Sequence, residues 1–492
     1  MRYLSDMARA SIDAGRLDSA ASIYEQLVRM APADPGVRHT LGLVYFEQGL
    51  TDKALYQIGR SIELDASNAV AYRSMADALN ASREFPLAIR AYEKAYALDP
   101  QNTDALLNMG SVFHALDMLD RARDTFLKII SQAPDHRQTL NNLGKVYHDA
   151  GQLRSALACY DRCLALNPDY AEARFNRAAL LLALGDFDRG WQEYEWRFKR
   201  SGAAKVYPHR LHMPRWRGES YRGRRLLVHC EQGMGDVLQF VRYLPSVKER
   251  GGQLILEAHA PLVPLLETLP WIDELISFNE KRPPDTPYDL QTPLLSLPGI
   301  FDTRPDTIPE KIPYIQIDPE AGNTWKNHLK ADGVNIGLVW TSSDLNPKRN
   351  LPIHKCTSWF QDPGLKFIGL QKGSGSGQLL SQKTNTSSIT ELGPLLNNFH
   401  DTAAAMLNLD LVISVDTAAA HLAGALGKRL WLLLPYSADW RWPLDGGDSP
   451  WYPGVKIFRQ SRAGDWDMVI HLVAEELQKL SAAFQINTLT PG

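Results

Sequence analysis

The chain has 492 residues, 44% of them apolar and 22% charged, a composition typical of a folded soluble protein with roughly two to four domains. Lys and Arg total 53 against 56 Asp and Glu, for a net charge of −3. This balance argues against a general nucleic-acid binder, which needs a basic surface to neutralise phosphates. No apolar run reaches the roughly 18–20 residues that cross a bilayer, and MRYLSDMARASIDAGRLD lacks the apolar segment of a signal peptide. The four cysteines fit no metal-ligand spacing, so we expect a cytoplasmic protein without a metal.

Turn-forming residues are distributed unevenly along the chain. Residues 1–200 hold 6 of the 30 prolines, 10 of the 34 glycines and 2 of the 12 tryptophans. A region poor in proline and glycine favours helices. In the remainder of the chain these turn-forming residues are as frequent as is typical of mixed helices and strands. The composition therefore predicts an all-α region followed by an α/β region.

A pattern of small residues repeats every 34 residues in the first region, at Ala8, Gly42, Ala76, Gly110, Gly144 and Ala178. A second small residue follows each of them, and then an aromatic or apolar one, at Tyr24, Ile58, Tyr92, Phe126, Tyr160 and Tyr194. Small residues let two helices approach closely, and prolines at the unit ends terminate the second helix. The period and order resemble the tetratricopeptide repeat. We therefore predict a solenoid of about six repeats over residues 1–200, with an atypical last repeat.

Three asparagines, Asn108, Asn142 and Asn176, precede the small residue of successive repeats by two positions. Repeat solenoids have a concave binding face, and an asparagine amide pairs with both N–H and C=O of an extended peptide. A similar asparagine ladder is known in the repeat domain of the O-linked N-acetylglucosamine transferase. We predict that these three residues bind an acceptor polypeptide. The alternative is that asparagine is simply common at this repeat position.

A basic segment follows the repeats. Residues 197–225 contain ten Lys or Arg residues, with Glu219 as the one acid. We interpret the whole segment 197–225 as a solvated connector, with the linker between the domains at residues 201–222. The alternative is that one or two of these arginines face an anionic ligand.

Apolar runs alternate with loops and helical patterns after residue 222. They predict strands at LLVHCE (226–231), QLILEA, DELISF, VNIGLVW (334–340), LKFIGL, DLVISV and LWLLL. Such alternation indicates parallel sheets. Two successive cycles predict a first lobe at 223–317 and a second at 318–492, which ends in a helix over 467–480. Ligands of such sheets bind beyond the carboxyl ends of the strands.

Two loops after predicted strands carry candidate functional residues. GMGD places Asp236 at the start of a helix, and SVDTAAAHLAGALGK (414–428) places Asp416, Thr417 and His421 at the start of another. A helix start offers free N–H groups and a positive dipole end to a phosphate. GMGD lacks the third glycine of a dinucleotide fingerprint, so no nicotinamide cofactor is expected.

These two segments resemble the corresponding motifs of bacterial glycosyltransferases of the heptosyltransferase type. The resemblance covers about 223–475 and implies the GT-B fold, with two Rossmann-like lobes that take acceptor and nucleotide-sugar donor. It also implies an inverting reaction that needs no metal or other cofactor. Three features depart from the family: Ala418 replaces a glycine, the first lobe is short, and the segment 435–454 resembles instead bacterial fusions of tetratricopeptide repeats to this domain. Some of those fusions modify proteins, including flagellin.

By this resemblance Asp236 is the catalytic base that removes the acceptor proton, with a helix cap as its alternative role. The expected donor-binding residues, which meet the charge of the leaving nucleotide, are Thr341, Ser342, Lys348, Arg349, Asp416, Thr417 and His421. His421 has a packed core position as its alternative. The tryptophans Trp440, Trp442 and Trp451 are expected to fill the space between the lobes, and the alternative is that they stack on a base or a sugar.

The sequence therefore predicts a glycosyltransferase that moves a sugar from a nucleotide sugar to a Ser or Thr hydroxyl of a protein held by the repeats. Flagellin is one candidate acceptor by resemblance. One alternative is a repeat adaptor with an inactive transferase-like region, which the short first lobe and Ala418 favour. Another is transfer to a lipid-linked saccharide, with the repeats serving assembly.

Overall fold

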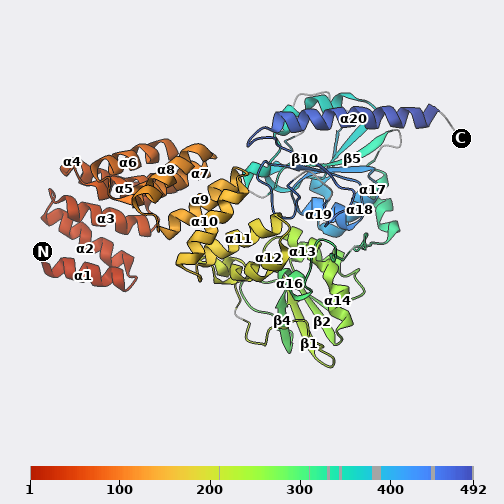
Figure 1. Ribbon diagram of the computed structural model, residues 1–492, viewed down its shortest axis with the longest axis horizontal. Helices are drawn as coiled ribbons and strands as arrows, with labels where there is room; N and C mark the ends of the chain where they lie inside the picture. The colour runs from red at the N-terminus through yellow and green to blue at the C-terminus, as the bar shows by residue number, and fades with distance from the viewer. Residues whose placement is uncertain are drawn as a thin grey trace. The chain divides into compact units, whose positions relative to one another are not determined.

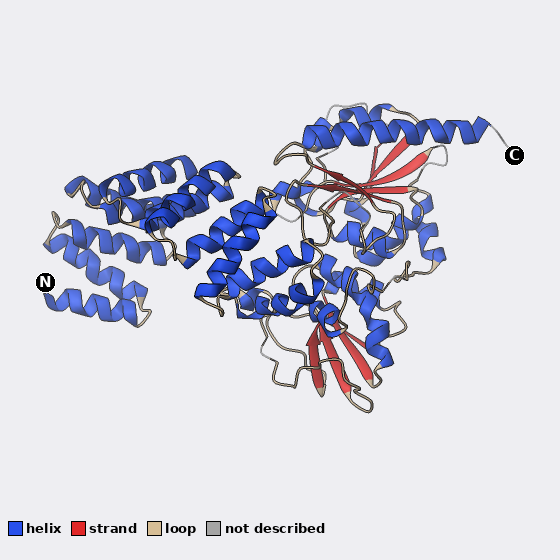
Figure 2. Cartoon of the chain, in the orientation of Figure 1, coloured by secondary structure: helices blue, strands red, loops and turns tan. Residues whose placement is uncertain are grey.

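The computed structural model describes residues 2–209, 211–309, 311–329, 333–342, 346–378, 389–444 and 449–489. The chain divides into two compact units, Met1–Pro168 and Asp169–Gly492, and each is described by itself. The first unit consists of stacked helix pairs (Figure 1), whereas the second combines helices with two groups of strands (Figure 2). The expected order of an all-α region followed by an α/β region is confirmed.

Antiparallel helix pairs follow the 34-residue period in the first unit. Its helices are α1 (Arg2–Asp13), α2 (Leu17–Met30), α3 (Pro35–Glu47), α4 (Thr51–Leu64), α5 (Ala69–Ala81), α6 (Phe85–Leu98), α7 (Thr103–Ala115), α8 (Leu119–Gln132), α9 (Arg137–Asp149) and α10 (Leu153–Leu166). The small residues lie where the two helices of a pair touch. A Cβ atom on Gly110 would lie 2.5 Å from the Phe126 ring, and one on Gly144 would lie 2.5 Å from the Tyr160 ring. Glycine therefore makes room for the ring of its own helix pair.

Helix caps repeat with the same period. Asp34, Asn68, Asn102 and His136 each precede the first helix of a pair and accept a backbone N–H of its first turn. These bonds satisfy donors that a helix start leaves unpaired. The period thus specifies the helix starts as well as the packing.

The turns inside the helix pairs also recur every 34 residues, each with one residue at positive φ. These residues are Gly15, Gly49, Arg83, Asp117, Gly151 and Gly185. Arg83 and Asp117, at φ 62° each, hold a conformation that costs a residue with a Cβ atom roughly 1–2 kcal/mol. Two turns of the solenoid are therefore strained.

We predict that Arg83→Gly stabilises the first unit by about 1 kcal/mol, because glycine removes this strain while losing some entropy on folding. Chemical denaturation followed by helix content measures the effect. Gly49→Ala is the matched control: it has open space for a Cβ atom and should lose a similar amount. A variant Arg83→Gly no more stable than the parent would contradict the prediction.

The second unit begins with one further helix pair, α11 (Ala171–Ala183) and α12 (Phe187–Tyr194), and continues into the first sheet. This parallel sheet has the order β3-β2-β1-β4, with β1 (Arg225–His229), β2 (Gln253–Ala258), β3 (Glu274–Ser277) and β4 (Leu290–Pro293). Its helices are α13 (Met234–Phe240), α14 (Leu244–Glu249), α15 (Val263–Leu266) and α16 (Leu297–Ile300). It forms the first of two Rossmann-like lobes.

The second lobe contains a parallel sheet of order β10-β9-β8-β5-β6-β7. Its strands are β5 (Val334–Val339), β6 (Leu365–Gly369), β7 (Ile389–Glu391), β8 (Leu411–Val415), β9 (Leu430–Leu434) and β10 (Lys456–Arg459), and its helices are α17 (Asn323–Lys326), α18 (Phe399–Leu407), α19 (Ala418–Ala425) and α20 (Trp466–Leu489). The buried runs of β5, β8 and β9 match the fully apolar strands expected of a sheet covered on both faces.

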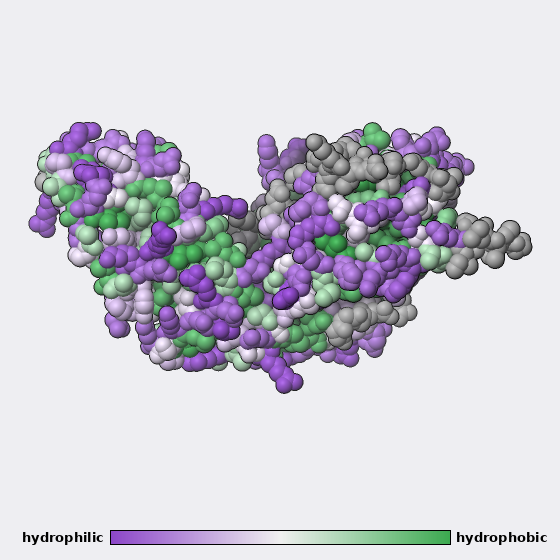
Figure 3. Space-filling view, turned by 90° about the horizontal axis from the view of Figure 1, so that it is seen from above, coloured by the Kyte–Doolittle hydropathy of each residue, from purple (hydrophilic) through white to green (hydrophobic). Residues whose placement is uncertain are grey.

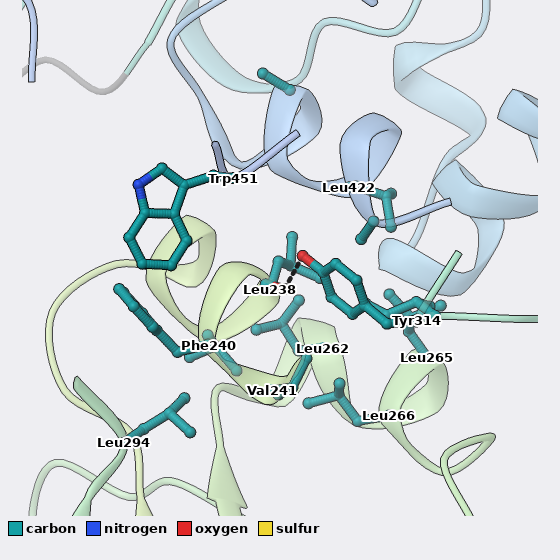
Figure 4. Packing of buried hydrophobic residues seen from close by; sticks show 14 of the residues in the cluster. Leu238, Phe240, Val241, Leu262, Leu265, Leu266, Leu294, Tyr314, Leu422 and Trp451 are labelled. Atoms are coloured by element: carbon teal, nitrogen blue, oxygen red, sulfur yellow. Dashed lines mark hydrogen bonds between the residues drawn. The ribbon is translucent and has the colours of Figure 1, made fainter. Parts of the chain in front are cut away.

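Aromatic side chains fill the contact between the two lobes. Trp451 packs edge-on against Phe240 with the ring centroids 5.7 Å apart, and the Tyr314 hydroxyl donates to the Leu238 carbonyl at 3.0 Å (Figure 4). Trp191 of α12 joins them, with its ring centroid 5.3 Å from that of Trp440. The last helix pair therefore shares a core with both lobes. Trp440 and Trp451 contact Phe240 of the first lobe, as expected, whereas Trp442 packs on His421 and Tyr452 of the second lobe.

Hydrophobic residues reach the surface in patches between hydrophilic ones (Figure 3). Over the described ranges, no helix has the length and apolarity needed to cross a membrane.

Candidate functional site

The two loops that carry the sequence motifs lie against each other. Asp236 is in the first turn of α13, after β1, and Asp416 directly follows β8. A Cβ atom on Gly235 would lie 2.9 Å from the His421 ring and 3.4 Å from the Ala418 Cα. The carboxyl end of one strand in each lobe therefore faces the other lobe, where ligands of parallel sheets bind.

We predict that Gly235→Ala destabilises the second unit by about 1–3 kcal/mol, the usual range for overpacking a close contact. His421 is buried and hydrogen-bonded, so it has little room to move. Gly233→Ala is the matched control, because its Cβ atom would have its nearest neighbour at 3.4 Å, an ordinary contact. Chemical denaturation compares the two. Equal stabilities of both variants would mean that the two loops are not in close contact.

Five charged side chains form an alternating row across this contact. Arg441 donates to the Asp236 carboxylate and, at 2.7 Å, to Asp439 Oδ1. Arg349 lies 3.7 Å from Asp439 Oδ2 and 3.1 Å from Asp416 Oδ2. The row joins the catalytic candidate of the first lobe to the donor-site candidates of the second. Arg441 and Asp439, two of its members, were not expected from the sequence.

Burial and pairing act in opposite directions on these acids. Burial raises the pKa of Asp236 and of Asp416 above the ordinary value, although Arg441 and Arg349, respectively, oppose this. Burial also disfavours ionised Asp439, but Arg441 and Arg349 together lower its pKa. The row thus has three carboxyl groups for two guanidinium groups. Proton uptake is therefore favoured at the carboxyl groups that end the row, Asp236 and Asp416.

Asp236 also caps its own helix. Its Oδ2 accepts the Gly233 N–H at 2.8 Å, which is the structural role considered for it. Its side chain remains 15% exposed, and its other carboxylate oxygen, Oδ1, accepts from Arg441. The structure therefore shows the cap directly, and the catalytic role stays a prediction.

His421 is part of the core at this contact. Its Nδ1 lies 2.9 Å from the Tyr452 hydroxyl, and its ring stacks on Trp442 at 5.5 Å. Burial, followed by nearby Arg441, lowers the pKa of His421 to about 3, so the ring is neutral near pH 7. Its Nε2 lies 4.0 Å from Asp416 Oδ1. The packed role is therefore present, and donor binding by His421 stays a prediction.

Thr417 starts α19 and has its hydroxyl 3.0 Å from that of Ser414. Because β5 and β8 are neighbouring parallel strands, the loop after β5 lies at the same sheet edge. That loop carries Thr341, whose N–H donates to Gln371 Oε1 at 2.9 Å, and Ser342, whose N–H donates to Asn350 Oδ1 at 2.8 Å.

A cavity of about 500 Å³ opens beside this loop. Its lining combines polar and apolar side chains: Thr341, Asn350, Leu351, Pro352, Ile353, His354, Gln378 and Trp466. Lys348 is exposed on the 3-10 turn η7 (Pro347–Arg349), next to Arg349. Among the predicted donor-site residues, the structure thus places Arg349, Asp416 and His421 close together and Thr341 at a neighbouring cavity.

The basic segment is only partly a solvated linker. Arg197 is completely buried and holds Glu231, with its Nε and Nη2 at 3.0 and 2.6 Å from the two carboxylate oxygens. Glu231 follows β1, so this ion pair ties the 3-10 turn η1 (Glu195–Lys199), which follows α12, to the first lobe. The expectation of a solvated side chain is wrong for Arg197, because a buried carboxylate requires a partner, and it is correct for Arg217, Arg222 and Arg224.

A buried carboxyl group lies at the carboxyl end of the first sheet. Glu257 of β2 is 1% exposed, and it accepts a hydrogen bond from the Tyr207 hydroxyl at 2.8 Å. Its neighbour across the strands is His229, whose ring centroid lies 4.3 Å from that of Tyr207. Burial raises the pKa of Glu257 to about 7 and lowers that of His229 to about 3. Both groups are therefore largely uncharged between about pH 3 and pH 7.

We predict that Glu257 makes the second unit less stable as pH rises. The folded chain holds its proton up to about pH 7, whereas the unfolded chain releases it near 4.5. The contribution of Glu257 to the free energy of unfolding is therefore fully present below pH 4.5. It declines as the pH rises through 7, by about 3 kcal/mol at most. Glu257→Gln should remove this decline.

Denaturation at pH 5 and pH 9 tests this: Glu257→Gln should gain stability over the parent at pH 9 relative to pH 5. Glu249→Gln, which changes an exposed carboxylate of the same lobe, is the control and should leave the difference unchanged. A gain of the same size at both pH values would contradict the assignment.

The asparagines expected to bind peptide lie in two different units. Asn108 donates to Asp77 Oδ1 at 2.8 Å, and Asn142 Oδ1 lies 3.4 Å from the amide of Asn141. Asn176 lies on α11 of the second unit. The alignment of all three therefore stays a prediction.

Within the ranges that the structure describes, no group of three or more His, Cys, Asp or Glu side chains is arranged to hold a metal ion. The charged row has carboxylates paired with guanidinium groups, which compete with any cation for the same oxygens. The guanidinium groups suit an anion instead.

Comparison with known families identifies the repeats. Two models described as Tetratricopeptide repeat match residues 5–69 and 79–142, and one described as TPR repeat matches residues 144–185. The chain therefore carries tetratricopeptide repeats in its N-terminal part, and a region of two parallel α/β lobes follows them.

Two relatives extend the comparison. Protein FlbA of Caulobacter vibrioides is 32% identical over 346 residues, which cover 64% of this chain and 56% of FlbA. This match is longer than the helical region, so it includes part of the lobes. BBSome complex member BBS4 of Bos taurus is 29% identical over 79 residues, 16% of this chain and 15% of BBS4. The chain thus spans about half the length of FlbA and less of BBS4.

Solved structures are similar over about a third of the chain. The crystal structure of MamA is 24% identical with a TM-score of 0.32, and covers 34% of this chain and 96% of MamA. PilF of Pseudomonas aeruginosa is 25% identical with a TM-score of 0.32, and covers 34% of this chain and 77% of PilF.

Proposed function

We propose that the chain is an inverting, metal-independent glycosyltransferase of the GT-B type. It transfers a sugar from a nucleotide-sugar donor to a Ser or Thr hydroxyl of a protein held by the repeats. Flagellin is one candidate acceptor. The main support is the meeting of Asp236 and Asp416, each at a strand end of a different lobe, across a row of arginines.

In this proposal Asp236 removes the proton of the acceptor hydroxyl as it attacks the anomeric carbon. The nucleotide leaves with growing negative charge, which Arg349, Lys348 and the N–H groups at the start of α19 stabilise. Thr341, Ser342 and Thr417 add hydroxyl groups at the same sheet edge, and Asp416 and His421 contact the donor. Asn108, Asn142 and Asn176 bind the acceptor backbone.

A second candidate function is a repeat adaptor with an inactive transferase-like region. The pairing of the carboxylates favours it, since Asp236 is held by Arg441 and by the Gly233 N–H, and Asp416 by Arg349. An adaptor of this kind binds no nucleotide sugar.

The test has two steps. A thermal-shift screen with a panel of nucleotide sugars should find one that stabilises the chain, because a ligand that binds the folded state raises its stability. Incubation with that sugar and candidate acceptors, flagellin included, should then add one sugar mass to a protein. Asp236→Asn should lower the rate by about 10²–10⁴-fold.

Asp273→Asn is the matched control, because Asp273 pairs with Lys248 in the same lobe, away from the row. It should keep the parent rate. A chain stabilised by no nucleotide sugar supports the adaptor. Full activity of Asp236→Asn would defeat the assigned mechanism.

A further inference from the structure

Arg441 has an unusual position in the charged row. It lies on the loop after β9 in the second lobe, yet it contacts two residues of α13 in the first lobe. Its Nη2 donates to Asp236, and its Nε donates to Gln239 Oε1 at 2.6 Å. Asp236 and Gln239 are three residues apart, so they lie on the same face of the helix.

Several neighbouring groups hold the guanidinium group of Arg441 in place. Its side chain is 7% exposed, and Asp439 accepts from its Nη1 at 2.7 Å. The guanidinium carbon of Arg441 lies over the Trp440 ring, 4.3 Å from the ring centroid. Trp440 in turn packs against Trp191 and Tyr194 of α12. These contacts leave Arg441 one orientation, which is a requirement for a residue that positions another.

We propose that Arg441 is the positioning residue for Asp236: it orients the carboxylate from the opposite lobe and favours its ionised form, which is the form that accepts the acceptor proton. The inference rests on the proposed function, in which Asp236 is the base. It adds to that function a residue of the second lobe on which the base of the first lobe depends.

Several groups act on the Asp236 carboxylate from the elements packed around it. The Gly233 N–H, Arg441 and Arg349 favour its ionised form, whereas Asp439 disfavours it. His421 of α19 is neutral, and Tyr194 of α12 is a weak acid whose pKa burial raises to about 12. Among these groups Arg441 is therefore the strongest that favours ionisation, and the Asp439 carboxylate opposes it.

Two substitutions should move the pH dependence in opposite directions. Arg441→Met removes the paired cation, so the acid limb of kcat/KM should move upward by about 1–3 pH units. Asp439→Asn removes the like charge, so that Arg441 pairs with Asp236 alone. The acid limb of kcat/KM should then move to lower pH. Arg462→Met is the control, because Arg462 is 84% exposed, and its profile should match the parent.

The full-length chain is assayed for sugar transfer across pH, with the parent and Asp236→Asn measured alongside. A purely structural role of Arg441 predicts lower turnover with an unmoved acid limb, and this result would overturn the inference. If Arg441→Met does not fold, Asp439→Asn decides: an acid limb that stays in place or rises overturns the inference. An inactive parent, or an active Asp236→Asn, counts against the proposed function itself and removes the basis of the inference.

Discussion

Burying charge between the two lobes is the constraint on which the second unit depends. A charged group taken out of water without a partner costs several kcal/mol, so each one must find its counterion nearby. The five residues of the charged row meet this condition only when the loops after β1, β5, β8 and β9 come together. They are Asp236, Arg441, Asp439, Arg349 and Asp416. The same condition brings the strand ends of the two lobes face to face. Arg242 in the adjoining core is buried too, and it donates to the Trp451 carbonyl and to the Tyr314 hydroxyl.

The last helix pair is a part of this arrangement. In the second, fourth and fifth pairs a glycine meets a large apolar side chain of the same pair, as Gly110 meets Phe126. In the sixth, Trp191 donates to the Thr303 carbonyl at 3.0 Å, and Arg197 binds Glu231. The repeat pattern weakens there because these side chains pack against the lobes instead of a following repeat. The sixth pair thus keeps the helical form of a repeat, and its side chains pack into the lobes.

Sequence reasoning found the repeats and most strands, and the strands that it missed share one property. β4, β7 and β10 each lie at the edge of a sheet. An edge strand is covered less than a central one, so its sequence need not be an apolar run: LQTP, ITE and KIFR are mixed.

The site divides in a similar way. Asp236 and Asp416 stand directly after recognisable strands, where parallel sheets bind ligands, so the sequence pointed to them. Arg441 and Asp439 lie in the irregular segment SADWRW, which has no periodicity. The one available signal was that two opposite charges flank Trp440 in a stretch rich in tryptophan.

The sequence by itself determined the helix pairs, their caps, the central strands and the order of the two lobes, because these depend on neighbours close along the chain. Only the tertiary structure decided that Arg197 is buried, that Glu257 holds its proton to about pH 7, and that Arg441 reaches Asp236. Each of these depends on burial and on a partner far along the chain, and both are set only when the lobes pack.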